Sequence, residues 1–183
     1  MRTFVGLFVP IGALLIVAAC QSSKPIAPPG PPLRTSVAIN EIMASMVEPS
    51  ADALWNAVAT NVTGAGADEK APKSDKDWAE LRGKALMLVE AMNLIVVDGR
   101  KVAPAGTKSA NPGAELEPAQ IEALLAQDRH AFVDLAHNLQ DTGLSALKAI
   151  EARDPEKLSD AGGDIDAACE KCHLEYWYPN KKA

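Results

Sequence analysis

Apolar residues recur three and four positions apart in four stretches of this chain, which is the spacing of one face of an α-helix. The clearest stretch follows Ser74 and Asp77, which are placed to cap a helix, and it stops at Asp98-Gly99. Its apolar steps of three, four, three, four and three are typical of a seam along which helices pack together. The residues on that seam are Trp78, Leu81, Ala85, Leu88, Met92 and Ile95.

A helix with the same spacing precedes this one. It covers about residues 36–60, and Pro49 should kink or restart it because proline has no backbone N–H to donate. Residues 61–73 are rich in Gly, Ala, Lys and Asp and are predicted to form a loop. Residues 100–116 are rich in Pro, Gly and Ser and form a second predicted loop, longer than most bundle connections.

Two more helices complete the pattern. The third begins at Glu117-Pro118 and ends at Arg153, and the fourth begins at Asp154-Pro155, both with proline at the first helical position. The sequence contains neither the alternation that predicts strands nor an internal repeat. We therefore predict an all-α protein that folds as an antiparallel four-helix bundle.

The N-terminal residues have the pattern of an export signal. Met1-Arg2 is a short basic start, residues 4–19 are mostly apolar, and small residues precede Cys20. This resembles a bacterial lipoprotein signal, in which the cysteine is acylated and becomes the first residue of the mature chain. The alternative is a plain signal peptide cleaved near Ala19. Gln21 differs from the aspartate associated with inner-membrane retention in some bacteria, so the outer membrane is slightly favoured.

Residues 20–35 are predicted to be a tether that holds the domain off a membrane. Five prolines lie between Gln21 and Arg34, which favours an extended, semi-rigid chain without core-forming residues. The predicted organisation is a signal peptide over residues 1–19, the tether over residues 20–35 and the helical domain over residues 36–183. Contact with a membrane is then expected through the lipid anchor alone.

The strongest chemical motif is Cys169-Glu170-Lys171-Cys172-His173. C-x-x-C-H is the attachment signature of haem c: two thiols add to the two vinyl groups of the porphyrin, and the histidine that follows binds the iron. The spacing suits one helical turn along one edge of the ring. It also places the two cysteines on the apolar face of the last predicted helix.

Three other interpretations of the motif are open. A redox-active dithiol expects a βαβ context, which this pattern lacks. Half of a zinc site needs a second pair of ligands, and His130 and His137 are seven residues apart without a partner cysteine. An ordinary disulfide is the third interpretation.

Cysteine count and charge change this picture in favour of haem. The chain has three cysteines, and a lipid on Cys20 with one covalent haem on Cys169 and Cys172 leaves none unassigned. Haem c is attached outside the bacterial cytoplasm, which agrees with export. The formal net charge of −6 argues against binding to nucleic acid, and an acidic surface suits a basic redox partner.

The position of the motif on the last of four helices resembles the class II cytochromes c, the cytochrome c′ type. In that family the haem lies inside the bundle, the motif histidine is the proximal ligand, and the distal side faces the first helix. The resemblance therefore implies that His173 is the proximal ligand and that Met43 is the candidate distal ligand, with Met46 as second choice. Homodimers are frequent in that family.

The bland alternatives for these residues remain open. Methionine is usually a core filler, so Met43 and Met46 could both pack against the ring and leave the iron five-coordinate. Surface or hydrogen-bonding roles are favoured for His130 and His137. The aromatic residues 176–178 either close the end of the bundle or shield the haem edge.

These observations predict a periplasmic, lipid-anchored carrier of single electrons with periplasmic or membrane redox partners. A five-coordinate haem protein that binds nitric oxide or carbon monoxide is the alternative, and a structural lipoprotein with a disulfide is the third. The sequence shows no Ser/His/Asp set, phosphate loop or carboxylate pair above background, so we do not expect an enzyme.

Overall fold

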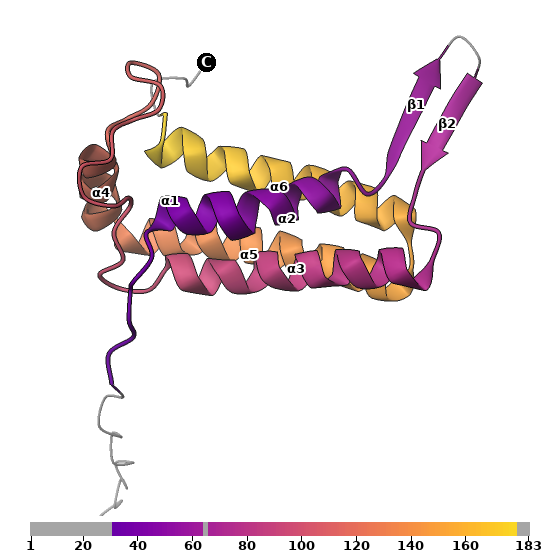
Figure 1. Cartoon of the computed structure of the whole chain (residues 1–183), viewed down its shortest axis with the longest axis horizontal. Helices are drawn as coiled ribbons and strands as arrows, with labels where there is room; N and C mark the ends of the chain where they lie inside the picture. The colour runs from indigo at the N-terminus through magenta and orange to yellow at the C-terminus, as the bar shows by residue number, and fades with distance from the viewer. Residues whose placement is uncertain (1–30, 64–65, 179–183) are drawn as a thin grey trace, which may run out of the picture. The chain divides into compact units, whose positions relative to one another are not determined.

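Helices dominate the structure, a computed structural model that describes residues 31–63 and 66–178 (Figure 1). The chain from Leu33 onward forms one unit. The predicted signal peptide, Cys20 and most of the predicted tether lie outside the described residues. The elements in chain order are α1 (Ile39–Ile42), the π-helix η1 (Met43–Val47), α2 (Glu48–Trp55), β1 (Ala59–Thr63), β2 (Gly66–Lys70), α3 (Asp75–Ile95), α4 (Pro118–Gln127), α5 (Arg129–Ala152) and α6 (Pro155–Tyr176).

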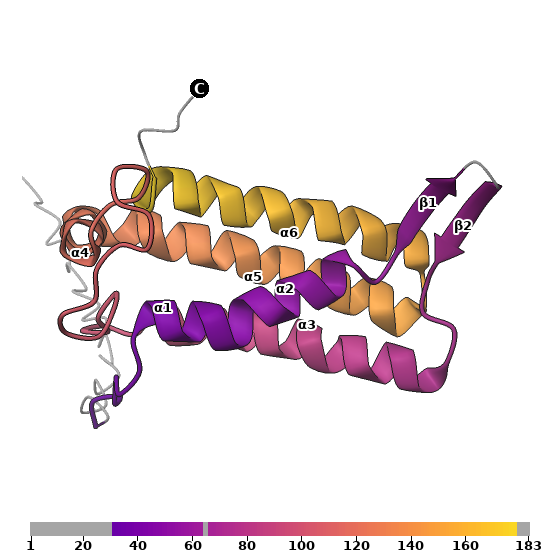
Figure 2. The ribbon, with the colours of Figure 1, turned by 45° about the horizontal axis from the view of Figure 1, so that its top comes forward.

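Four helical segments run alternately in opposite directions and make a bundle (Figures 1 and 2). They are the continuous segment α1–η1–α2, followed by α3, α5 and α6. Each segment packs against the next one along the chain, and α2 closes the ring against α6. The prediction of an all-α, antiparallel four-helix bundle is confirmed, with the short helix α4 added at one end and a small hairpin at the other.

The predicted apolar seams form the core of the bundle. On α3 the seam residues are buried from Trp78 onward except for Leu81, which is partly buried. On α6 the seam leads directly towards the cysteine motif. The buried members of the α6 seam are Leu158, Ala161, Ile165 and Ala168.

Side-chain caps fix where two of these helices begin. The Ser74 hydroxyl accepts a hydrogen bond from the Asp77 N–H at 3.2 Å, and the Asp77 carboxylate accepts one from the Ser74 N–H at 2.9 Å. The Asp154 carboxylate accepts from the Lys157 N–H at 3.0 Å, with Pro155 in the first turn of α6. These contacts satisfy donors that every helix start leaves unpaired, and both predicted helix starts are confirmed.

The predicted third helix is two helices, so its predicted continuity from residue 118 to 153 is wrong. The chain leaves helical geometry at Asp128, where φ is −136° and ψ is 76°. The Asp128 carboxylate accepts a hydrogen bond from the Ala131 N–H at 3.0 Å and so caps the start of α5. An aspartate inside an apolar pattern is a start signal that periodicity alone does not reveal.

The predicted loop over residues 61–73 contains an antiparallel hairpin, which corrects both that prediction and the extension of the first helix to residue 60. The first helical segment ends at Trp55, and β1 then pairs with β2 from Ala59 opposite Lys70 to Thr63 opposite Gly66. Three of the five β1 residues are β-branched, which favours an extended backbone over a helix.

Pro49 does not break the first helix; a wider turn precedes it. In an α-helix Pro49 would leave the carbonyl of Ser45 without a donor, and its ring would clash with that carbonyl. Instead the five residues Met43–Val47 form η1, in which the Glu48 N–H donates to the Met43 carbonyl, five residues back. The helical backbone therefore continues through Pro49, and the interruption predicted there takes the form of one wide turn directly before it.

The long loop between α3 and α4 covers the start of α1. The Ile39 and Asn40 N–H groups donate to the Lys101 and Val102 carbonyls, each at 2.9 Å. Val102 is buried, and its own N–H donates to the Glu122 carboxylate on α4 at 3.2 Å. The first turn of α1 is thus capped by backbone from this loop, which holds it against the end of the bundle.

No helix among the described residues combines the length and the hydropathy needed to cross a membrane.

Candidate functional site

The cysteine motif occupies the last turns of α6. Cys169, Cys172 and His173 precede the end of the helix at Tyr176. The His173 carbonyl accepts hydrogen bonds from the Trp177 N–H at 2.8 Å and the Tyr178 N–H at 2.9 Å, which ends the helix. The motif therefore lies within a regular α-helix. The helix ends shortly after it, with both of these hydrogen bonds made to the His173 carbonyl.

The chain after the motif is tied to the loop before α4. The Leu116 N–H donates to the Trp177 carbonyl at 2.9 Å, so residues 100–117 and the end of α6 are held together. The Ser109 hydroxyl in the same loop donates to the Glu115 carboxylate at 3.3 Å. The predicted loop over residues 100–116 thus forms part of the wall around the motif.

A cavity of about 880 Å³ lies beside the motif. This volume is within the range of roughly 300–1,000 Å³ that is typical of cofactor sites. Its lining is mainly apolar and comes from every helix of the bundle, from α4 and from the loop before α4. Cys169, Cys172 and His173 all line it from α6.

The segment α1–η1–α2 also contributes to the lining. Met43 in η1 lines the cavity, together with Val47 and Ala51 further along the same segment. Met46 does not line the cavity; it is partly buried against the core. The structure therefore brings Met43 to the same cavity as the cysteine motif and does not bring Met46 there.

The two other histidines lie outside this cavity. Both are exposed on α5, and neither belongs to the lining. The His130 Nδ1 lies 3.0 Å from an Asp134 carboxylate oxygen one turn further on. This placement agrees with the surface and hydrogen-bonding roles that the sequence favours for His130 and His137.

Burial keeps both thiols of the motif protonated at neutral pH. Burial, with a smaller effect of the Asp166 carboxylate, raises the pKa of Cys169 to about 11. Burial, followed by the effects of Cys169 and Glu175, raises the pKa of Cys172 to about 12. A redox-active dithiol needs a thiolate with a lowered pKa, so this environment does not suit that interpretation.

The imidazole of His173 is in the form that binds a metal ion. Burial lowers the pKa of His173, and the Glu170 and Glu115 carboxylates oppose this only in part. A neutral imidazole has a free nitrogen lone pair at neutral pH. Glu115 was not identified from the sequence, because its proximity to the histidine depends on the path of the loop before α4.

The motif cysteines are free thiols, not a disulfide, in this structure. Within the described part of the chain, no group of three or more His, Cys, Asp or Glu side chains is arranged to hold a metal ion. Residues 31–63 and 66–178 therefore provide no set of ligands that would support the zinc-site interpretation.

Two polar residues in the lining fit a bound group with hydrogen-bonding capacity. The Asn40 Oδ1 is buried and has no hydrogen-bond partner in the protein, which is costly unless another group supplies one. Lys108 is the single lysine or arginine in the lining, where the acidic side chains include Glu48, Asp52 and Glu115. Haem c fits this environment: apolar walls for the ring, two thiols, an imidazole and a cation near the rim.

The three aromatic residues after the motif all line the cavity. The Tyr176 and Phe132 rings meet edge to face, with centroids 5.8 Å apart. The Trp177 and Tyr178 rings lie 6.2 and 5.9 Å from the His173 ring, centroid to centroid. The Tyr178 hydroxyl donates to the Glu170 carboxylate at 2.6 Å, so this side chain is fixed beside the motif.

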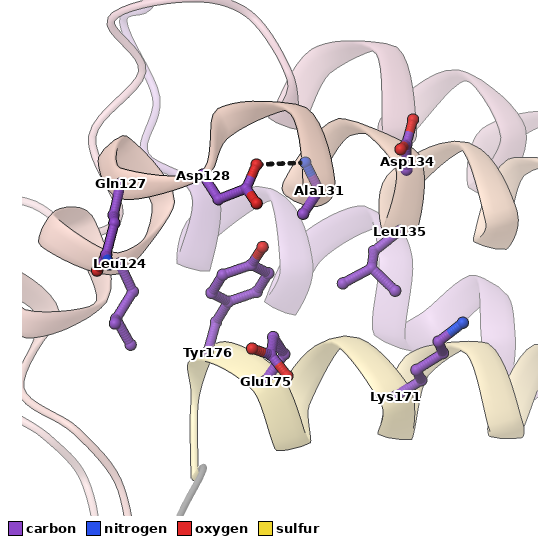
Figure 3. Close-up of a pocket in the computed structure, with 9 residues that line it drawn as sticks. All are labelled: Leu124, Gln127, Asp128, Ala131, Asp134, Leu135, Lys171, Glu175 and Tyr176. Atoms are coloured by element: carbon purple, nitrogen blue, oxygen red, sulfur yellow. Dashed lines mark hydrogen bonds between the residues drawn. The ribbon is translucent and has the colours of Figure 1, made fainter.

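A second, more polar cavity of about 620 Å³ lies between α6 and the junction of α4 and α5 (Figure 3). Tyr176 and Leu135 line both cavities and so form the wall between them. Figure 3 shows Tyr176 reaching from α6 towards the junction, close to Asp128. The aromatic residues therefore both close the bundle end and border the main cavity.

No family model matches this sequence, and no curated protein matches it either. A solved structure of a cytochrome c′ is similar over 76% of this chain and 88% of its own, with 21% sequence identity and a TM-score of 0.46.

Proposed function

We propose that this protein is a c-type cytochrome that carries one covalently attached haem and transfers single electrons outside the cytoplasm. One observation supports this above all: Cys169, Cys172 and His173 line a largely apolar cavity of about 880 Å³, and Met43 lines it from another helix. The protein would act as an electron carrier between redox partners and not as an enzyme.

The side chains of α6 would hold the cofactor. The Cys169 and Cys172 sulfurs are three residues apart on a helix, which is the spacing for thioether bonds to the two vinyl groups of haem. The neutral His173 imidazole would bind the iron from the same side. Bound haem supplies a one-electron couple, and the apolar wall limits the access of water to it.

The Met43 thioether would be the second axial ligand. Methionine is a soft ligand that raises the reduction potential of haem iron and closes the sixth position. His173 and Met43, both held on helices, would keep the same ligand set for the iron in both oxidation states. These properties suit an electron carrier.

Gas binding is the second candidate function. Besides Met43, the segment α1–η1–α2 presents apolar residues such as Ala44, Val47 and Ala51 to the cavity, together with the Glu48 and Asp52 carboxylates. If the Met43 side chain only packs against the ring, the sixth position is open to nitric oxide or carbon monoxide. The two functions therefore differ in the role of one side chain.

The proposed location is the periplasmic side of a bacterial membrane, with the outer membrane slightly favoured. It depends on acylation of Cys20 and removal of residues 1–19, which the sequence pattern supports. Cys20→Ala should release the protein from membranes while leaving its haem content unchanged. If the variant stays in the membrane fraction, the lipid anchor is wrong.

The cofactor is tested by expressing the full chain with the haem maturation machinery. A denaturing gel stained for haem should show covalent attachment, and Cys169→Ala combined with Cys172→Ala should abolish it. Absence of covalent haem from the unaltered protein would refute both haem functions.

The ligand at the sixth position is tested with two matched methionine variants. Met43→Ala should remove the weak red absorption band of a methionine–ferric iron bond and should speed carbon monoxide binding. Met46→Ala is the control and should change neither, because Met46 does not line the cavity. A high-spin spectrum with rapid carbon monoxide uptake in the unaltered protein would favour the gas-binding function.

A further inference from the structure

The turn that carries Met43 is unusual, and its geometry has a consequence for the site. In η1 the Glu48 N–H donates to the Met43 carbonyl, so Met43 lies one turn before Glu48. In an α-helix the same N–H would donate to the carbonyl four residues back, which belongs to Ala44. The wide turn thus places a methionine where a regular helix would place an alanine.

The wide turn also keeps two neighbouring rows of side chains on the cavity. Ile39, Met43, Val47, Ala51 and Trp55 line it, and so do Asn40, Ala44, Glu48 and Asp52; within each row the residues are four apart. A step of four residues in an α-helix overshoots a full turn by about 40°, so four such steps would drift by about 160°. One extra residue in a π turn takes back about 100° of that drift.

The same turn separates Met43 from Met46. Three residues of an α-helix advance by about 300°, which would leave the two side chains about 60° apart on one face. Each residue of a wider turn advances less, so three residues cover less of the circle and Met46 points further from the direction of Met43. This agrees with the presence of Met43 and the absence of Met46 in the lining.

Pro49 is the residue that excludes the regular alternative. It has no N–H for the Ser45 carbonyl, and its ring would collide with that carbonyl in an α-helix. The segment α2 is held against both α3 and α6, whereas α1 packs against α3 and the loop before α4. If the turn closed to an α-helix, α1 would therefore be the part that rotates.

We infer that Pro49 is a positioning residue: it holds the π turn that places Met43, in preference to Met46, on the cavity that the cysteine motif also lines. This inference rests on the proposed function for the role of Met43 as an iron ligand. The position of Met43 on the cavity is argued from the helix geometry alone. Pro49 itself does not line the cavity and acts only through the turn.

The test compares five forms of the full chain with its haem attached: the unaltered protein, Pro49→Ala, two rescue variants and a control. In Pro49→Ala we expect the turn to close, Ala44 to take the place of Met43, and the methionine–iron band to be lost. Adding Ala44→Met to Pro49→Ala should restore the band with a new methionine. Deleting Ser45 in the Pro49→Ala background should also restore it, because Met43 is then four residues before Glu48. Met46→Ala is the control and should leave the spectrum unchanged, because Met46 does not line the cavity.

Two nuclear magnetic resonance readouts separate this inference from the proposed function. Coupling across the hydrogen bond from the Glu48 N–H to the Met43 carbonyl reports the π turn and needs no haem. The ring-current shift of the Met43 methyl group, in the ferrous carbon monoxide form, reports its position over the porphyrin whether or not it binds iron. If the unaltered protein shows that shift without a methionine–iron band, the ligand role fails and the positioning role stands.

Several results would overturn the inference. Retention of the Glu48–Met43 hydrogen bond in Pro49→Ala would show that Pro49 does not hold the turn. Loss of that bond without any change in the Met43 methyl shift would show that the turn does not position the side chain. If no haem is attached, the hydrogen-bond coupling and the nuclear Overhauser contacts of the Met43 methyl with other cavity residues decide the question. Circular dichroism of each variant confirms that the bundle is folded.

Discussion

Gly143 sets how closely α3 and α5 approach each other. Replacing it with alanine should change the stability of the protein in two opposing ways, through helix propensity and through overpacking. A Cβ atom added at this position would lie 3.0 Å from the Val89 Cγ2, which is tighter than ordinary van der Waals contact. Val89 is buried, and valine in a helix has one strongly preferred rotamer, so its methyl group cannot move aside at low cost. Both helices contribute to the wall of the cavity beside the cysteine motif.

The size of the effect follows from comparison with Gly83, an exposed glycine inside α3. No atom lies within 4 Å of a Cβ added at Gly83, so Gly83→Ala should stabilise the protein by about 1 kcal/mol through helix propensity alone. Gly143→Ala gains the same term, but overpacking of a buried contact costs about 1–3 kcal/mol. The expected net change for Gly143→Ala is a loss of roughly 0–2 kcal/mol.

Urea denaturation followed by circular dichroism measures both variants against the unaltered protein. The midpoint should rise for Gly83→Ala and should stay level or fall for Gly143→Ala, with Gly143→Val clearly lower than either. If Gly143→Ala is stabilised as much as Gly83→Ala, the close packing of α3 on α5 at this point is wrong.

Three further predictions test the core, the helix start and the cavity rim. Leu88→Ala should cost about 2–5 kcal/mol in the free energy of unfolding because Leu88 is fully buried, whereas Leu86→Ala, on the exposed side of α3, should cost much less in the same urea assay. Hydrogen bonds from Lys157 lower the pKa of Asp154. The stabilising charge of Asp154 is therefore present above the unfolded-state pKa near 4 and is lost as pH falls through the folded-state pKa. The stability difference between the unaltered protein and Asp154→Asn should shrink in acid, and a constant difference would contradict this. Lys108→Gln should lower the midpoint potential of the attached haem, because a lost positive charge favours the ferric form, while Lys101→Gln, outside the lining, should change the potential less in the same redox titration.

The parts of the fold that depend on local signals could be predicted from the sequence. The start of α3 at Ser74 and the start of α6 at Asp154-Pro155 follow from capping chemistry that needs only a few neighbouring residues. The burial of the α3 and α6 seams follows from spacing within one helix. The cysteine motif is likewise local, and its position on the core face of the last helix is confirmed.

The parts that were missed depend on competition between local preferences. The break at Asp128 interrupts an apolar pattern that continues on both sides of it. The periodicity therefore predicts one helix, whereas the Asp128 cap divides the segment into α4 and α5. The hairpin after Trp55 arises in a segment whose small polar residues mark a loop and whose β-branched residues also permit strands. Glu115 and Lys108 reach the cavity through the path of a long loop, which no sequence spacing encodes.

The cavity itself follows from how the same two helical segments meet at their two ends. Towards the hairpin, α2 packs directly on α6, and the α6 seam there consists of buried Leu158, Ala161 and Ile165. Towards the other end, the α6 seam continues through the cysteine motif, and both α6 and the segment α1–η1–α2 line the cavity there. The α6 seam changes from apolar residues to thiols and an imidazole at this end, while the periodicity that aligns the helices continues. The apolar periodicity therefore predicts the bundle, and the residues that depart from large apolar side chains along that periodicity locate the site within it.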